Sequence, residues 1–112
     1  MSSQPRPTSS APEWHAVLPA KEIPAGAIRA VEVDGQSLVM VRVGDSYFAL
    51  DRSCPHQEGD LAAGRVLGKA LKCPLHGYMF SLENGRGLNC RGYNARLHAA
   101  RVVDGVLQIR LA

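Results

Sequence analysis

The sequence predicts an all-β protein, a small antiparallel barrel or sandwich into which a subdomain of loops and short strands is inserted. Aspartate and glycine pair, in either order, between β-rich runs at Asp34-Gly35, Gly44-Asp45 and Asp104-Gly105. Such pairs supply the positive φ angles that two-residue hairpin turns require. No stretch shows the apolar spacing of a helix over three turns. The 112 residues suffice for one domain and are too few for two.

The barrel strands are expected on both sides of the inserted subdomain. Their expected positions are residues 13–17, 27–33, 36–43, 46–51, 96–103 and 105–111. Only a short turn is expected at residues 21–25, because Pro19 and Pro24 would interrupt a longer helix. Residues 1–12 are rich in serine and proline and nearly lack large apolar side chains. This composition predicts a disordered tail, followed by one domain at residues 13–112.

The inserted subdomain, about residues 52–92, is rich in glycine and has a proline directly after two of its cysteines. Short strands are expected near residues 61–66, 69–72 and 78–82, with a hairpin turn at residues 83–86. Loops this long need something to order them. A bound metal would do so, and it would add to the modest stability margin of a domain of this size.

Charge and composition narrow the classes of partner. The formal net charge is +3 without a run of lysine or arginine, and aromatic residues make up only 5%. Nucleic acid is therefore not an expected partner, whereas an acidic protein is compatible with the basic excess. No apolar run reaches membrane-spanning length and no signal peptide opens the chain, so we expect no membrane contact and a cytoplasmic location.

Cysteine and histidine occur as two closely spaced pairs, Cys54-x-His56 and Cys73-x-x-His76. Two loops of this kind, facing each other, would offer two thiolates and two imidazoles to one metal centre. Such a ligand set suits a single zinc ion or a 2Fe-2S cluster, and spacing alone does not separate the two. Zinc sites more often use paired cysteines, which favours the cluster. A cysteine nucleophile with a histidine base is disfavoured, because two equivalent pairs are redundant and no orienting third residue is evident.

The surrounding residues make the pattern more specific. The segment CPHQEGDLAAG…KCPLHGYMFSLENGRG resembles the Rieske family of 2Fe-2S proteins. The likeness extends to the strands that precede residue 54 and to the final hairpin, so it covers nearly all of residues 13–111. The matching positions outside the two ligand motifs are Leu61, Gly64, Phe80 and Gly85.

The resemblance implies a Rieske-like, three-layered antiparallel β fold with one 2Fe-2S cluster per chain at the tip of the subdomain. By the same resemblance, Cys54 and Cys73 bind the inner iron, and His56 and His76 bind the outer one. Four ligands saturate the cluster and leave no open site for a substrate. We therefore expect an electron-transfer protein or a component of a multicomponent oxidoreductase, and not an enzyme by itself.

The resemblance also predicts that the reduction potential of this protein is low among members of the family. High-potential members carry an additional disulfide, and Gly59 and Leu75 stand where its cysteines would be. Such members also place a serine and a tyrosine after the second histidine, where this chain has Tyr78 and Phe80. Phenylalanine cannot donate a hydrogen bond to the cluster, and such bonds raise the potential.

Several other residues receive more ordinary interpretations. The region of residues 87–100 lacks the proline that often closes this site in the family, and its Cys90 is expected to be a small loop or core residue. His15 and His98 are expected at the surface or partly buried, Trp14 in the core, and Glu58 and Asp60 in solvent. The basic residues that flank the ligand loops form either a solvated rim or a docking face for an acidic redox partner; they are Arg65, Lys69, Lys72, Arg86 and Arg91.

The leading hypothesis for function is a low-potential Rieske ferredoxin. Such a carrier passes single electrons from a flavin-dependent reductase to a terminal enzyme, such as a ring-hydroxylating oxygenase. The main alternative is a small Rieske subunit of a larger reductase, for instance one that resembles the nitrite reductase small subunit. A zinc-stabilised binding module is a third possibility from a different class.

Overall fold

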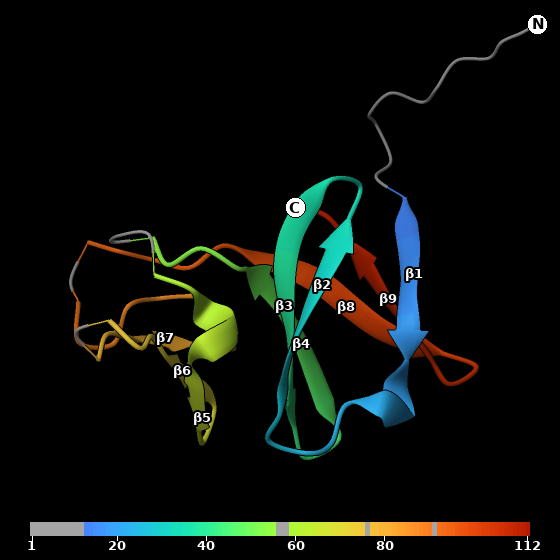
Figure 1. Ribbon diagram of the computed structural model, residues 1–112, viewed down its shortest axis with the longest axis horizontal. Helices are drawn as coiled ribbons and strands as arrows, with labels where there is room; N and C mark the ends of the chain where they lie inside the picture. Colours follow the sequence, from blue (N-terminus) through green and yellow to red (C-terminus); the bar gives the residue numbers. More distant parts are fainter. Residues whose placement is uncertain (1–12, 56–58, 76, 91) are drawn as a thin grey trace, which may run out of the picture.

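A computed structural model describes residues 13–55, 59–75, 77–90 and 92–112 (Figure 1). The tail expected at residues 1–12 therefore lies outside the described residues, as do residues 56–58, 76 and 91.

Six antiparallel strands form the larger sheet, in the order β1-β9-β8-β4-β3-β2. Their bounds are β1 Trp14–Pro19, β2 Ile28–Val33, β3 Gln36–Val43, β4 Ser46–Asp51, β8 Leu97–Val103 and β9 Val106–Arg110. The two outer strands, β1 and β2, also approach each other, so the sheet curls toward a barrel. The prediction of a small antiparallel all-β fold is confirmed.

A second, smaller sheet is inserted between β4 and β8. It has the order β5-β6-β7, with β5 at Arg65–Leu67, β6 at Ala70–Lys72 and β7 at Met79–Ser81. This sheet lies beside the larger one, at the left of Figure 1, and the loops that carry the cysteines extend beyond it. Two short 3-10 helices complete the described elements, η1 at Ala20–Glu22 and η2 at Leu61–Ala63. No helix among the described residues is long and apolar enough to cross a membrane.

The turn dipeptides form the hairpins expected from them. Asp34 and Asp104 adopt φ of 52°, and the glycine after each has φ near 80°, so the backbone makes a tight turn with two left-handed residues. These turns join β2 to β3 and β8 to β9. Gly44 supplies the positive φ at the turn between β3 and β4.

One predicted strand is wrong in its first half. Residues 61–63 form η2, and only residues 65–67 of the segment pair as a strand. The cause is local, because the Asp60 carboxylate accepts a hydrogen bond from the Ala62 N–H at 2.9 Å and caps the helix. The turn at residues 83–86 forms around Gly85, but the chain after it makes only isolated bridges.

The hydrophobic core lies on both faces of β3. Leu38 and Met40 pack on one face with Leu107 and Ile109, inside the curled sheet. Their neighbours Val39 and Val41 point the opposite way, because side chains alternate along a strand. That second face packs against the inserted subdomain and contributes to a buried cluster with Leu71, Phe80, Leu82 and all three cysteines. The three cysteines thus belong to the same buried cluster as residues of both sheets.

Candidate metal centre

The first ligand loop leaves the larger sheet at the end of β4 and returns at η2. Arg52 and Asp60 close its base with a bidentate ion pair, Nε–Oδ1 at 2.8 Å and Nη2–Oδ2 at 3.0 Å. Within the loop, the Cys54 N–H donates to the Gly59 carbonyl at 2.9 Å. This backbone bond returns the chain to the cysteine after only five residues. The loop is therefore held closed at two levels, one at its base and one beside Cys54.

The same ion pair changes the acidity of its carboxyl group. The hydrogen bond and the charge of Arg52, together with the Ala62 N–H, hold the pKa of Asp60 below its ordinary value, although partial desolvation opposes this shift. The Asp60 side chain, expected to be a solvated carboxylate, is 45% exposed and in addition pairs with Arg52.

The second ligand loop begins where β6 ends. The Cys73 N–H donates to the Tyr78 carbonyl at 2.7 Å, which closes the loop between β6 and β7. Gly77 sits inside it with φ of 68°, a conformation that a residue with a side chain rarely adopts. The Leu75 N–H lies 3.5 Å from the Cys73 sulfur and donates to it. A backbone donor of this kind stabilises a thiolate over a thiol.

The two cysteine side chains meet in the core. Cys73 is fully buried and Cys54 is 4% exposed, and neither forms a disulfide. Burial raises the pKa of the Cys73 thiol, and the nearby Cys54 and Cys90 thiols raise it further; the Leu75 N–H acts in the opposite direction. A buried Cys73 thiolate beside a second sulfur is therefore unfavourable without a counter-charge. A cationic centre bound by both would remove that penalty, since a metal deprotonates the thiol that binds it.

Gly59 lets the backbone of the first ligand loop approach the Cys73 sulfur closely. A Cβ atom at this position would lie 2.8 Å from the Cys73 sulfur and 3.3 Å from the Cys54 Cβ. It would also lie 3.3 Å from the Leu75 Cδ1, so Gly59 and Leu75 are direct neighbours. These are the two positions where a disulfide was expected to be missing, and the described cysteines are indeed free.

The loop after Gly85 covers the second ligand loop. The Met79 N–H donates to the Asn89 Oδ1 at 2.8 Å, and the Asn89 Nδ2 donates to the Gly77 carbonyl at 3.1 Å. Cys90 is part of this loop and is 6% exposed, with its sulfur 3.8 Å from the Met79 carbonyl oxygen. The expectation of a small core residue is confirmed for Cys90, although it lies closer to Cys73 than its place in the sequence suggested.

Of the four predicted site residues, the structure describes two, Cys54 and Cys73. Cys54 and Cys73 come together as expected. His56 and His76 lie outside the described residues, so the structure does not test their place in the ligand set. Within the described ranges, no group of three or more histidine, cysteine, aspartate or glutamate side chains could hold a metal ion.

Two further expectations need correction. The His98 side chain is completely buried: its Nδ1 accepts from the Ala112 N–H at 2.9 Å, so its Nε2 carries the proton and donates to Asp51 at 2.7 Å. Trp14 is only partly buried, because it lies at the edge strand β1 with Arg101 and Arg110 over its ring at 3.9 and 4.9 Å.

Sequence reasoning did not identify the residues that shape the two loops. Arg52 and Asp60 flank the first motif. Their opposite charges on either side of a short loop could have suggested the ion pair. Asn89 had no such signal, because its partners are backbone groups of a loop ten or more residues away.

Comparisons with known proteins agree with this centre. Among curated proteins, the ferredoxin component of the naphthalene 1,2-dioxygenase system of Pseudomonas aeruginosa is 29% identical over 97 residues, which cover 81% of this chain and 93% of that protein. The oxygenase subunit of 5,5'-dehydrodivanillate O-demethylase from Sphingobium sp. is 35% identical over 71 residues, 62% of this chain, but the match spans only 17% of that protein's length.

Solved structures give the same fold. A chain of the complex of reduced oxygenase and oxidized ferredoxin in carbazole 1,9a-dioxygenase superposes with a TM-score of 0.80 at 27% identity, over 87% of this chain and 92% of that one. The putative NADH-dependent nitrite reductase small subunit from Mycobacterium tuberculosis superposes with a TM-score of 0.84 at 21% identity, over 92% and 99%. The family described as the Rieske [2Fe-2S] domain matches residues 13–101. The chain therefore belongs to the Rieske [2Fe-2S] domain family, and this membership implies one 2Fe-2S cluster per chain.

Proposed function

We propose that this protein is a one-electron carrier of the Rieske ferredoxin type. The observation that carries the proposal is the pair of buried, mutually facing thiols of Cys54 and Cys73 at the heart of a matched Rieske domain. A bound 2Fe-2S cluster supplies reversible one-electron chemistry. The protein's part is to hold that group in a low-dielectric pocket and to leave one side of it close to the surface.

For the ligand set we propose Cys54 and Cys73 on the inner iron and His56 and His76 on the outer one. The burial of both cysteines supports the first half. Pro55, just before His56, and Pro74 and Leu75, before His76, are exposed, which supports an outer half that is turned toward solvent. Neutral imidazoles donate less charge than thiolates, so with this ligand set the outer iron would be the one to accept the electron.

The partners we propose are a flavin-dependent reductase as donor and a terminal oxygenase as acceptor. Support comes from the naphthalene dioxygenase ferredoxin component, whose length this chain nearly matches, and from the solved oxygenase–ferredoxin complex of the same fold. The alternative, a small subunit of a larger reductase, draws on the fold of the nitrite reductase small subunit. Size-exclusion chromatography of the native protein separates them, because a subunit elutes with a large partner and a free carrier does not. The cytoplasmic location stays a prediction.

We further propose a potential in the lower part of the range of Rieske centres, about −150 to +300 mV. Phe80 is fully buried in the same apolar cluster as both cysteines and offers no hydroxyl donor. Gly59 and Leu75 lie side by side without a disulfide. A reductive titration with a midpoint in the upper part of this range would contradict the proposal.

The deciding experiment is spectroscopic analysis of anaerobically purified protein. We expect a red-brown oxidised form, a rhombic EPR signal on reduction, and about two iron and two sulfide ions per chain. A colourless protein with one bound zinc ion would refute the proposal. The variant His76→Cys tests the ligand set: we expect an altered spectrum and a lower potential, and an unchanged spectrum would remove His76 from the set.

A further inference from the structure

The small sheet places two positive charges directly opposite each other. Arg65 on β5 and Lys72 on β6 are cross-strand partners in the register of this hairpin. Like charges at such a position destabilise a sheet, because the side chains project to the same face at short range. The arrangement is therefore not explained by the stability of the hairpin.

Nearby carboxylates do not neutralise this pair. Asp60 is occupied by both nitrogens of Arg52, and Glu83 is paired with Lys69 at 3.3 Å. Among the described residues, neither Arg65 nor Lys72 forms an ion pair or a side-chain hydrogen bond. The two cations are thus available to a group outside the described part of the chain.

A hollow connects the two charges to the metal centre. A cavity of about 400 Å³ is lined by Arg65, Lys72, Cys73, Pro74 and Gly77, together with residues 63–64. The Lys72 side chain lies over the second ligand loop, because a Cβ atom at Gly77 would be 3.3 Å from the Lys72 Cε. The positive charge is therefore held beside the loop that carries Cys73.

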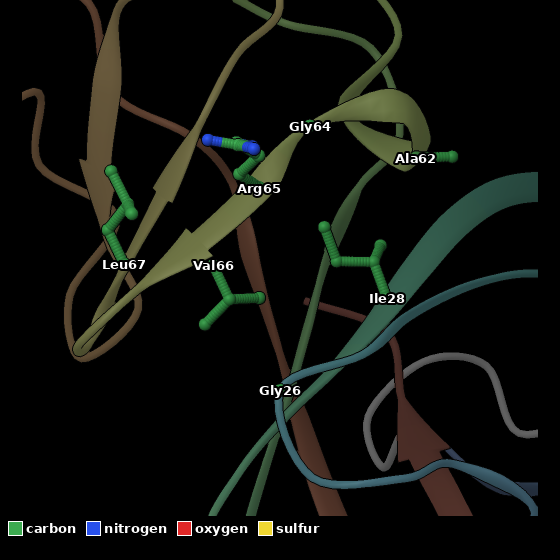
Figure 2. Close-up of a pocket in the computed structure, with 7 residues that line it drawn as sticks. All are labelled: Gly26, Ile28, Ala62, Gly64, Arg65, Val66 and Leu67. Carbon is green, nitrogen blue, oxygen red and sulfur yellow. The ribbon is translucent and has the colours of Figure 1, made fainter.

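On β5, successive side chains point to opposite sides of the strand. Figure 2 shows Val66 pointing toward Ile28, into a neighbouring cavity of about 480 Å³, while Arg65 and Leu67 point the other way. Leu67 is 45% exposed, and Leu75, next to the cavity-lining Pro74, is 40% exposed. Exposed apolar side chains beside unpaired charges are the composition of a protein-docking surface and not of a pocket for a small anion.

We propose that Arg65 and Lys72 form a docking point for carboxylate side chains of an acidic protein partner, beside the Cys73 loop. The inference rests on the proposed function and deepens it, because it states the chemistry of the redox partner's surface. Charges at such a rim accelerate the encounter more than they tighten the complex, and their effect falls as salt screens them.

The test compares two double variants that lose the same charge. Arg65→Gln/Lys72→Gln removes the proposed docking point, and Arg101→Gln/Arg110→Gln removes two cations from the far end of the larger sheet. Each protein is reduced with dithionite and oxidised in a stopped-flow instrument by anionic iron(III)–EDTA or by cationic tris(phenanthroline)cobalt(III). A hexaglutamate peptide is then added as a redox-inactive mimic of an acidic surface.

At low ionic strength, we expect Arg65→Gln/Lys72→Gln to react about fourfold more slowly with the anionic oxidant, as Coulomb's law in water gives for two unit charges about 10 Å away. Its reaction with the cationic oxidant should become faster. The control should change much less with either reagent, and all differences should vanish near 1 M salt. Hexaglutamate should slow the anionic reaction of the wild type and the control, but not that of Arg65→Gln/Lys72→Gln.

Equal losses in the two double variants would overturn the inference, because they would reflect net charge. A slower reaction of Arg65→Gln/Lys72→Gln with both oxidants would overturn it too, because the pair would then act on electron transfer itself. A wild-type protein that reacts with neither reagent would instead refute the proposed function.

Discussion

Replacing Gly59 with alanine introduces one methyl group against the Cys73 sulfur. The backbone at this position does not have a positive φ, so alanine itself is not strained there. The added Cβ would lie 2.8 Å from the sulfur, whereas unstrained contacts between carbon atoms begin at about 3.5 Å. The sulfur and the Gly59 backbone must therefore move apart by at least about 0.7 Å. A functional constellation tolerates displacements of only about 0.5 Å.

The expected result has two parts, one for the cluster and one for the fold. Overpacking of a well-packed core costs about 1–3 kcal/mol, so the apoprotein should remain folded with a lower midpoint of urea unfolding. Reconstitution with iron and sulfide should give clearly fewer than the two iron ions per chain expected of the wild type.

Gly68→Ala is the matched control. Gly68 has φ of 61° and no atom near its would-be Cβ, so alanine there strains the backbone without touching a cysteine. Its cost should be about 1–2 kcal/mol, with full iron and sulfide content. The reasoning fails if Gly59→Ala binds wild-type amounts of iron and sulfide, or if Gly68→Ala loses them to the same extent.

Three further predictions concern residues around the centre. The pKa of Asp60 is lowered, so the ion pair with Arg52 contributes stability above the ordinary pKa of the carboxyl, about 3.9, and loses it as pH falls through the lower folded value. The gap in Tm between wild type and Arg52→Gln should thus be constant above about pH 5 and close in stronger acid; a gap that is constant to pH 2 would contradict this. Cys90→Ser should keep the iron content of the wild type, and loss of iron on reconstitution would make Cys90 a ligand. His98→Phe should lower the free energy of unfolding by about 1–3 kcal/mol in urea titrations, because it removes both hydrogen bonds of the buried imidazole, and an unchanged midpoint would refute this.

The strands were predictable because their signals are local. An Asp-Gly pair fixes a hairpin through the φ angles of two residues, and alternation of apolar residues then fixes the register of both strands. The two Cys/His motifs, Cys54-Pro55-His56 and Cys73-Pro74-Leu75-His76, were equally local. Both cysteines could be assigned to one site without knowing the path of the chain between them.

Contacts between distant residues were not predictable in the same way. Asp51 and His98 are 47 residues apart, and only the pairing of β4 with β8 brings them together. Cys90 was expected in a loop or core, but its position under Cys73 depends on how residues 86–94 fold back over β7. The pairing of Asp60 with Arg52 was missed for a third reason: eight residues separate the two, and an exposed carboxylate carries no local sign of its partner.

The lack of proline in the loop over the centre has a structural answer. Proline would restrict such a loop through its fixed φ, whereas here Asn89 ties it down by hydrogen bonds to Met79 and Gly77. The backbone of Gly87 also packs closely against Cys90, because a Cβ atom at Gly87 would lie 2.7 Å from the Cys90 sulfur. The bonds of Asn89 are exposed, and each contributes only about 0.5–1.5 kcal/mol, so water can replace them at modest cost. Cys90 belongs to this covering loop and is buried in one cluster with Cys54 and Cys73, so the cover and the two ligand loops share one core.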